Sequence, residues 1–431
     1  MKYFLTTLLS IILFTSISFG GTKMEIFNLN NGIKVIFKQT KSVEILCLKL
    51  HSPISVIHEK SSKSGVTSLL YNSMIKSTKK RNAEALATDI ENLGSSISPD
   101  IEYEYSGWTL NCMSQYFDQS CEILSDIILN PAFDSKETDK ERELMIQAIK
   151  VRQDSIKSVA GDKFIADFYD KNNPYSKIKS GTQETLKELT QQDLKDCYNK
   201  IYSTKGAVIT VVGNIKKSVL KKTLNKYFGQ MNLTQEKQNV VLPDNPIRTG
   251  EDTVVNSKFN QAFIIYAYDA PNVLDKDSIT LKMINLVLGA RMTGRLFIEL
   301  REKLGLAYEV NSTYPTRLDK SYFEIYIGLD KKNIDVTKNG IEKIMNDLCN
   351  NKIMDKELND TLNFIKGIYL LSHQSVERQA YYLSAREMLG LGYEYDDKYI
   401  DLLSEVTPDD IIRVANKYFK QKPYKLILMP N

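Results

Sequence analysis

The chain contains two copies of one helix-and-strand pattern, and this internal repeat constrains the fold more than any other feature of the sequence. Two stretches of helical spacing, each followed by a strand-like run, match at a constant offset of 217 residues: 189–202 with 207–212, and 406–419 with 424–428. In each copy a threonine, Thr190 or Thr407, stands where it can cap a helix N-terminus, and an aspartate follows three residues later. The repeat predicts a duplicated unit of about 200 residues, which is a common size for one domain.

Within each copy, strands and helices fall in separate clusters. Asn30, Asn31 and Gly32 separate two alternating runs, and an Asn-Gly step favours a hairpin turn. A strand over 45–50 follows, and helical spacing then predicts helices near residues 65–76, 83–93, 115–129 and 136–155. This order favours an α+β fold with two homologous halves, each an antiparallel sheet with helices packed on one face.

A polar segment separates the two halves. Residues 232–250 are rich in Asn and Gln, contain Pro243 and Pro246, and have the composition of a linker. We therefore predict an N-terminal domain over residues 21–231 and a C-terminal domain over residues 251–431.

The first twenty residues have the composition of a secretory signal peptide. Lys2 precedes an apolar run over residues 4–19, and Ser18 and Gly20 are small residues suited to a cleavage site before Gly21. An uncleaved membrane anchor is the alternative, but the run is short and is diluted by hydroxyl side chains. No later stretch is long and apolar enough to cross a membrane. The sequence thus predicts export to the periplasm or an equivalent extracytoplasmic space, without an integral membrane segment after cleavage.

Charge and residue counts exclude several functions. Lys and Arg number 57 against 53 Asp and Glu, and the charges are spread along the chain, so no basic stripe for nucleic acid is present. The only histidines are His51, His58 and His373, so any site needing several imidazoles must use these three. The five cysteines form no C-x-x-C pair and are interpreted as small buried apolar residues.

Residues 64–80 resemble the insulinase/pitrilysin family, which includes the mitochondrial processing peptidase subunits. In that family this helix carries H-x-x-E-H, in which two histidines one turn apart bind Zn²⁺ and the glutamate acts as general base. The resemblance places Ser68 and Asn72 at the histidine positions and Tyr71 at the glutamate position. On a later helix, Ala148 stands where the family has a further zinc-binding glutamate.

These four side chains argue against zinc-dependent peptide hydrolysis by the first half. Serine, asparagine and alanine supply neither imidazole nor carboxylate, and a phenol with an ordinary pKa near 10 is a poor base at neutral pH. A substitute site built from His51, His58 and Glu59 is the remaining alternative, but these histidines are seven residues apart in a strand-to-loop stretch. His373 is interpreted as a packed helix residue. We therefore predict no metal or other cofactor in this chain.

Residues 288–310 are similar to another segment of the same family, a glycine-rich turn followed by Arg-Leu-Phe and then Arg-Glu-Lys-x-Gly-x-x-Tyr. Its arginine and tyrosine are present here as Arg301 and Tyr308, seven residues apart. The resemblance implies that both reach the zinc site of the opposite half-molecule, bind the substrate backbone and stabilise the oxyanion. The alternative is that each residue, taken by itself, is present only for packing or as a surface side chain.

The resemblance implies a division of labour between two chains. We expect a non-catalytic subunit of an exported heterodimeric zinc metallopeptidase, inactive alone, which closes like a clamshell with an H-x-x-E-H partner around an unfolded peptide. The partner would hold the zinc, and this chain would supply Arg301 and Tyr308. Two alternatives stay open: a binding or scaffold protein with the peptidase fold and no role in proteolysis, and a self-sufficient peptidase with a relocated metal site.

Overall fold

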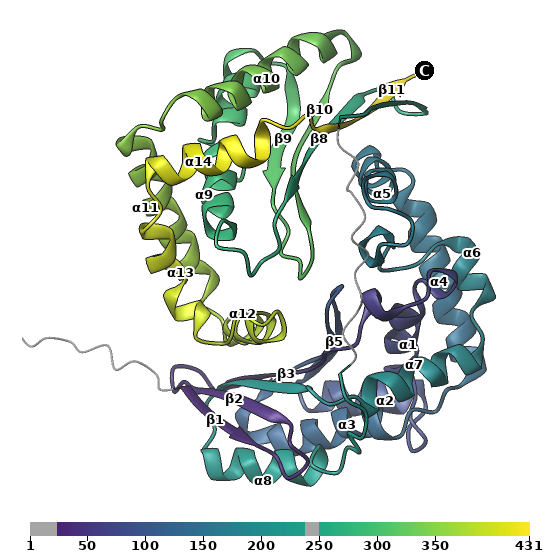
Figure 1. Cartoon of the computed structure of the whole chain (residues 1–431). Helices are drawn as coiled ribbons and strands as arrows, with labels where there is room; N and C mark the ends of the chain where they lie inside the picture. The colour runs from purple at the N-terminus through teal and green to yellow at the C-terminus, as the bar shows by residue number, and fades with distance from the viewer. Residues whose placement is uncertain (1–23, 238–249) are drawn as a thin grey trace, which may run out of the picture.

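The computed structural model describes residues 24–237 and 250–431. The predicted signal peptide and most of the predicted linker lie outside these ranges. Within them, no helix has both the length and the hydrophobicity needed to cross a bilayer. The two halves of the chain form the arms of a C-shaped molecule (Figure 1).

The first half is built on a six-stranded sheet with the order β1-β2-β6-β3-β5-β4. Its strands are β1 (Met24–Asn28), β2 (Lys34–Gln39), β3 (Ile45–Ser52), β4 (Ser96–Ile101), β5 (Ser106–Met113) and β6 (Val208–Gly213). Its helices are α1 (Val66–Met74), α2 (Ala83–Asn92), α3 (Phe117–Leu129), α4 (Ser135–Arg152), α5 (Ile156–Phe168), α6 (Gln183–Glu188), α7 (Gln191–Ser203) and α8 (Lys217–Tyr227). Apolar residues of α1, α3, α7 and α8 form one core with the sheet. The predicted hairpin is confirmed, with Gly32 at a positive φ of 87° in the turn between β1 and β2.

The second half repeats this plan on a five-stranded sheet with the order β7-β11-β8-β10-β9. Its strands are β7 (Asp252–Ser257), β8 (Ala262–Ala270), β9 (Ala307–Thr313), β10 (Ser321–Leu329) and β11 (Tyr424–Pro430). Its helices are α9 (Ser278–Leu288), α10 (Ile334–Asn350), α11 (Asp355–Ser372), α12 (Val376–Met388), α13 (Tyr395–Ser404) and α14 (Pro408–Phe419). The core of this half includes buried apolar residues of α9, α10 and α14.

The predicted α+β fold is confirmed, but each sheet contains one parallel pair. β2 pairs with β6 in parallel, and β7 pairs with β11 in parallel, whereas all other neighbours are antiparallel. A parallel pair needs a crossover of a dozen or more residues, and the helices between the paired strands supply it. The prediction of wholly antiparallel sheets is therefore wrong for one pair in each half.

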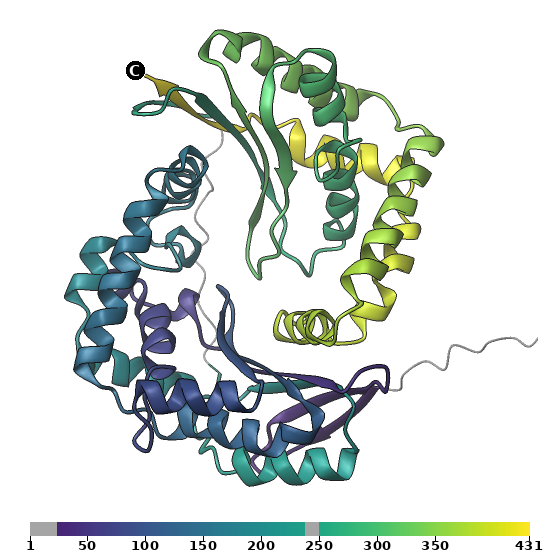
Figure 2. The ribbon, with the colours of Figure 1, turned by 180° about the vertical axis from the view of Figure 1, so that it is seen from behind.

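The two halves exchange one helix each, so both sheets are covered on both faces. Helix α12 of the second half lies on β3 and β6 of the first sheet, and α5 of the first half lies on β8 and β11 of the second (Figures 1 and 2). Leu383 of α12 clusters with Cys47 and Val212, and Phe164 of α5 clusters with Tyr322. The prediction of helices on one face only is corrected by this exchange. Burial on two faces also explains why β6 is buried along its whole length.

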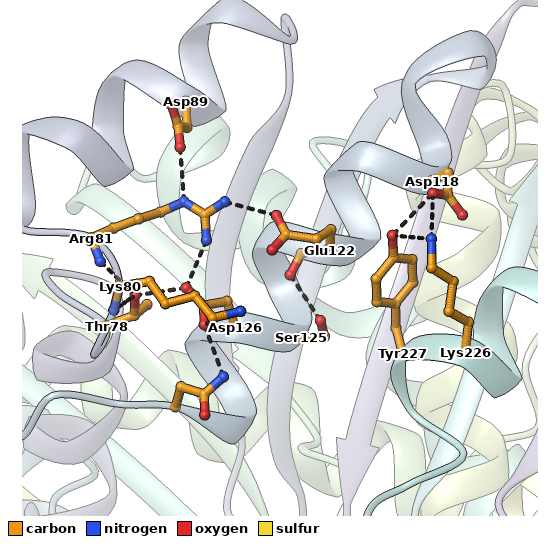
Figure 3. A network of polar contacts seen from close by, with 11 residues as sticks. Thr78, Lys80, Arg81, Asp89, Asp118, Glu122, Ser125, Asp126, Lys226 and Tyr227 are labelled. Atoms are coloured by element: carbon orange, nitrogen blue, oxygen red, sulfur yellow. Dashed lines mark hydrogen bonds and ion pairs between the residues drawn. The ribbon is translucent and has the colours of Figure 1, made fainter.

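Ion pairs fix the loop that follows α1. The Arg81 guanidinium lies 2.8 Å from Asp89 of α2 and, on α3, 2.8 Å from Glu122 and 2.7 Å from the buried Asp126 (Figure 3). A second cluster in the same view joins α3 to α8 through Asp118. These contacts hold α1 and α3 in a fixed relation, and α1 carries the positions that the family resemblance assigns to zinc ligands.

Candidate functional site

The position of the expected catalytic base is filled by a core side chain. Tyr71 on α1 is fully buried, its ring centroid lies 5.0 Å from that of Trp108, and its hydroxyl lies 3.1 Å from Ser106 Oγ. Burial raises the pKa of the Tyr71 phenol well above its ordinary value. Tyr71 is therefore neutral and out of reach of a substrate, and it cannot act as a base.

The other three positions offer no metal ligand either. Ser68 Oγ donates a hydrogen bond of 2.8 Å to the carbonyl oxygen of Lys179, and Asn72 is half-buried one turn further along α1. Ala148 is exposed on α4, two turns beyond Glu141. The Lys76 ammonium lies 3.1 Å from the Glu141 carboxylate and ties α1 to α4. The helices of the expected site are thus packed together, but none of the four side chains is among the usual zinc ligands.

His51, His58 and Glu59 do not combine into a substitute site. Glu59 accepts hydrogen bonds of 2.9 Å from the backbone N–H groups of Gly65 and Thr67, so it caps the N-terminus of α1. The short helix η1 (Val56–His58) ends at His58, whose Nδ1 accepts from the backbone N–H of Ser55, and His51 lies on β3. In residues 24–237 and 250–431, no group of three or more His, Cys, Asp and Glu side chains could hold a metal ion.

Arg301 and Tyr308 both lie on the surface of the second half. Arg301 belongs to a π-helical segment, η5 (Phe297–Lys303), and its guanidinium carbon lies 4.9 Å from the Phe297 ring centroid. Tyr308 lies on β9, an edge strand, with 65% of its surface exposed. Gly305 joins the two elements with a positive φ of 62°. Both side chains are therefore accessible to a ligand, and an explanation by core packing does not apply to either.

One salt bridge holds β9 against the first half. Lys157 of α5 lies 2.5 Å from the Glu309 carboxylate, next to Tyr308, and also donates to the Tyr326 hydroxyl at 2.9 Å. Burial raises the pKa of the nearby Glu324 carboxyl to about 7. No local pattern in the sequence predicts this contact, because Lys157 and Glu309 are 152 residues apart.

Two sequence profiles match consecutive parts of the chain. Residues 54–180 match the profile described as insulinase (peptidase family M16), and residues 188–364 match the profile described as the peptidase M16 inactive domain. The chain belongs to the insulinase family. The predicted family is confirmed, and the chain is a peptidase-like protein of this family.

Bacterial proteins resemble this chain over nearly its whole length. An uncharacterized zinc protease of Rickettsia felis is 24% identical over 414 residues, which covers 94% of this chain and 98% of the relative. A protease from Helicobacter pylori has the same fold, with a TM-score of 0.86, 20% identity, and coverage of 95% of this chain and 100% of that one. A peptidase M16 inactive domain from Pseudomonas fluorescens gives a TM-score of 0.86 at 18% identity, with 95% and 98% covered. At these identities the solved structures establish the shared fold.

A buried histidine, His51, joins the two halves of this insulinase-family protein, a role that the sequence did not predict for it. His51 Nδ1 lies 2.7 Å from Ser384 Oγ on α12, and His51 Nε2 lies 3.1 Å from Asp100 Oδ2 on β4. The Asp100 carboxylate faces Nε2 without meeting hydrogen-bond geometry, and its negative charge favours a proton on Nε2, with Nδ1 left to accept from the Ser384 hydroxyl. Burial lowers the pKa of His51, although Asp100 opposes that shift.

This histidine predicts an acid-sensitive fold. When the pH falls below about 6.5, the unfolded chain takes up a proton on His51 that the folded chain resists, so the free energy of unfolding falls. We expect the urea midpoint of the wild type to drop between about pH 7.5 and about pH 5.5, and the drop to be smaller in His51→Asn. Comparing the two urea curves at both pH values isolates this histidine from other acid-sensitive groups. An equal drop in both proteins would contradict the prediction.

Proposed function

We propose that this chain is the non-catalytic, Arg/Tyr-bearing subunit of an exported heterodimeric zinc metallopeptidase that degrades or processes unfolded peptides. The proposal rests on a contrast between the site residues of the two halves. The first half keeps the helices of the zinc site but none of its ligands, whereas the second half keeps Arg301 and Tyr308 on its surface. The zinc and the catalytic base would come from a partner of the same family with an intact H-x-x-E-H motif.

The chemistry of the two retained residues suits this role. A guanidinium is always charged and carries several N–H donors, and a phenol carries one O–H donor. Aimed at a scissile carbonyl, such donors stabilise the negative charge that develops on its oxygen, and removal of one donor typically costs about 10²–10³ in rate. In the described part of the chain no carboxylate forms an ion pair with Arg301, so its charge is available to a substrate.

The sheet edges offer a way to hold an extended peptide. β4 ends the first sheet and β9 ends the second, and each pairs with one neighbouring strand within its sheet. A peptide added to such an edge is bound through main-chain hydrogen bonds, so affinity depends weakly on its sequence. Because Tyr308 lies on β9 itself, a peptide on this edge would pass close to the phenol.

The isolated chain is expected to bind no stoichiometric zinc and to cleave no peptide. Chain beginning at Gly21 is incubated with excess zinc, dialysed against metal-free buffer, and examined by elemental analysis and by hydrolysis of a quenched-fluorescence peptide. A family member with an intact H-x-x-E-H motif, treated identically, serves as positive control. One zinc per chain, or chelator-sensitive hydrolysis by the isolated chain, would replace this proposal with the self-sufficient peptidase.

A binding or scaffold protein is the second candidate, and one observation favours it. Tyr71 has become part of the core of the first half, so the former base position now serves packing. If packing or binding were the only role left to the whole chain, replacement of Arg301 and Tyr308 would leave every proteolytic activity of the purified complex unchanged.

A further inference from the structure

A cavity of about 530 Å³ lies between the two halves, away from Arg301 and Tyr308. Its walls come from α9, α11, α12 and α13 of the second half and from the connection between β4 and β5 of the first. The volume falls within the range of about 300–1,000 Å³ that small ligands occupy in proteins. Neither the family resemblance nor the proposed peptidase role assigns a function to it.

The cavity walls are rich in tyrosine. Six of these rings come from the second half and one from the first: Tyr314, Tyr369, Tyr381, Tyr382, Tyr395, Tyr399 and Tyr105. Tyrosine gives a large, rigid apolar contact area with a polar tip, and it loses little conformational freedom on binding. Such walls fit a ligand with an aromatic or apolar body.

Lys282 of α9 lines the same cavity without a counter-charge. Its ammonium lies 5.7 Å from the ring centroid of Tyr395 and 5.6 Å from that of Tyr399. Within the described residues, no carboxylate lies within ion-pair distance of this ammonium. Burial, together with the charge of Arg386, lowers the pKa of Lys282 to about 8, so the side chain still carries its charge at neutral pH. Lys282 is half-buried in the cavity wall, and a partly desolvated ammonium without an anion is unfavourable, so an anionic ligand would stabilise it.

The acid that contacts two of the lining side chains, Asp396, is already paired with them. Asp396 is buried, its Oδ1 lies 3.1 Å from Nη2 of Arg386, and its Oδ2 lies 3.0 Å from Nε2 of His373. The His373 ring also stacks on the Tyr382 ring at a centroid distance of 4.5 Å. This cluster holds the cavity wall in place and leaves no carboxylate for Lys282.

The two acids at the other end of the cavity are also paired. Glu102 lies 2.9 Å from the Lys179 ammonium, and Glu104 accepts a hydrogen bond of 2.8 Å from the Tyr175 hydroxyl. The Arg317 guanidinium carbon lies 4.1 Å from the Tyr103 ring centroid, and its charge faces Glu104. Among the described residues, neither Arg317 nor Lys282 forms an ion pair, but the charge of Glu104 acts on Arg317, whereas no carboxylate acts on Lys282.

We propose that this cavity binds an organic carboxylate carried on an aromatic or apolar group, with Lys282 pairing with the carboxylate and the tyrosine rings contacting the rest. One unbalanced ammonium matches one negative charge, and the mostly aromatic walls disfavour a compact, strongly hydrated anion such as phosphate. The C-terminus of a peptide and a free aromatic acid both present this chemistry. The inference stands apart from the role proposed for Arg301 and Tyr308.

Calorimetric titration of the mature chain tests the inference with three probes: the tripeptide Ala-Ala-Phe, its C-terminal amide, and 3-phenylpropionate. We expect the tripeptide acid to bind at least about tenfold more tightly than the amide. Lys282→Gln should weaken binding of the acid by a similar factor and leave the amide unchanged, whereas Lys282→Arg, which keeps the charge, should retain binding. Lys276→Gln removes an exposed lysine just before α9 and should bind like the wild type.

The probes also separate the two ligand sources. Tighter binding of the tripeptide than of 3-phenylpropionate would support a peptide C-terminus, and the reverse order would support a free aromatic acid. Failure of both acids to bind, equal binding of acid and amide, or binding by Lys282→Gln equal to the wild type would overturn the inference. The comparison of acid with amide uses the wild type alone, so it stands even if a variant fails to fold.

Discussion

Replacement of Arg301 by alanine is expected to slow peptide cleavage by the native complex about a hundredfold. The complex is recovered from the cells that make it through a tag on this chain, and cleavage of an unfolded peptide is followed with and without a zinc chelator. The loss is expected in kcat/KM, because the guanidinium would stabilise charge that appears only as the carbonyl is attacked. Arg301 is exposed and is held by no ion pair within the described residues, so its removal should leave the free energy of unfolding unchanged.

Lys303→Ala is the matched control for this experiment. Lys303 lies on the same helical segment η5, is exposed, and pairs with Glu299 at 2.6 Å, so the variant also loses one positive charge there. We expect near wild-type cleavage from this control and a marked loss from Tyr308→Phe. Cleavage that survives both Arg301→Ala and Tyr308→Phe would support the scaffold alternative, and so would the absence of chelator-sensitive cleavage from the wild-type complex.

Local features of the fold could be predicted because short-range chemistry determines them. Thr190 and Thr407 both cap their helices as predicted, each with its hydroxyl accepting from the backbone N–H of the aspartate three residues later. Helices predicted near 65–76 and 83–93 are observed as α1 and α2, within two residues at each end. Caps and helical spacing depend on neighbours in the sequence, so a single sequence is sufficient to locate them.

The exchange of α5 and α12 could not be predicted in this way, because it depends on contacts between residues more than 100 positions apart. A weak signal did exist, since the offset of 217 residues carries α5 onto residues 373–385, three residues from α12. The repeat therefore indicates that the two helices occupy equivalent positions in the two halves. It does not indicate which sheet each helix covers.

The sequence located the candidate site residues but could not show their surroundings. Position alone marked Tyr71 as a lost base, and only the structure shows that its ring is buried against Trp108. Lys282 is half-buried at a cavity whose other walls come from α11, α12 and α13 and from the connection between β4 and β5. Burial of a charged side chain is a property of tertiary packing, so no local pattern reports it.

Replacement of Asp100 by alanine is expected to lower the free energy of unfolding by about 3–5 kcal/mol. Asp100 Oδ2 lies 2.6 Å from the Lys49 ammonium and 3.1 Å from His51 Nε2. Burial alone would raise the pKa of Asp100, but its contacts with His51 and Lys49 hold that pKa well below its usual range. The Lys49 side chain is only 5% exposed, so removal of the carboxylate leaves an enclosed cation without its partner. Urea unfolding at neutral pH measures the loss.

Asp89→Ala is the control that distinguishes the loss of this buried carboxylate from the loss of a surface ion pair. Asp89 also pairs with a cation, Arg81, at 2.8 Å, but its side chain is 45% exposed and water can replace it. We expect a cost of at most about 1 kcal/mol there. Asp100 lies on β4, and its partner His51 also contacts Ser384 on α12, so the larger loss should extend to the contact between the halves. Faster proteolysis near α12 in Asp100→Ala than in Asp89→Ala would show that loosening. Equal losses in the free energy of unfolding of the two variants would contradict the prediction. They would mean that water solvates the Lys49 ammonium and that this cluster does not hold the halves together.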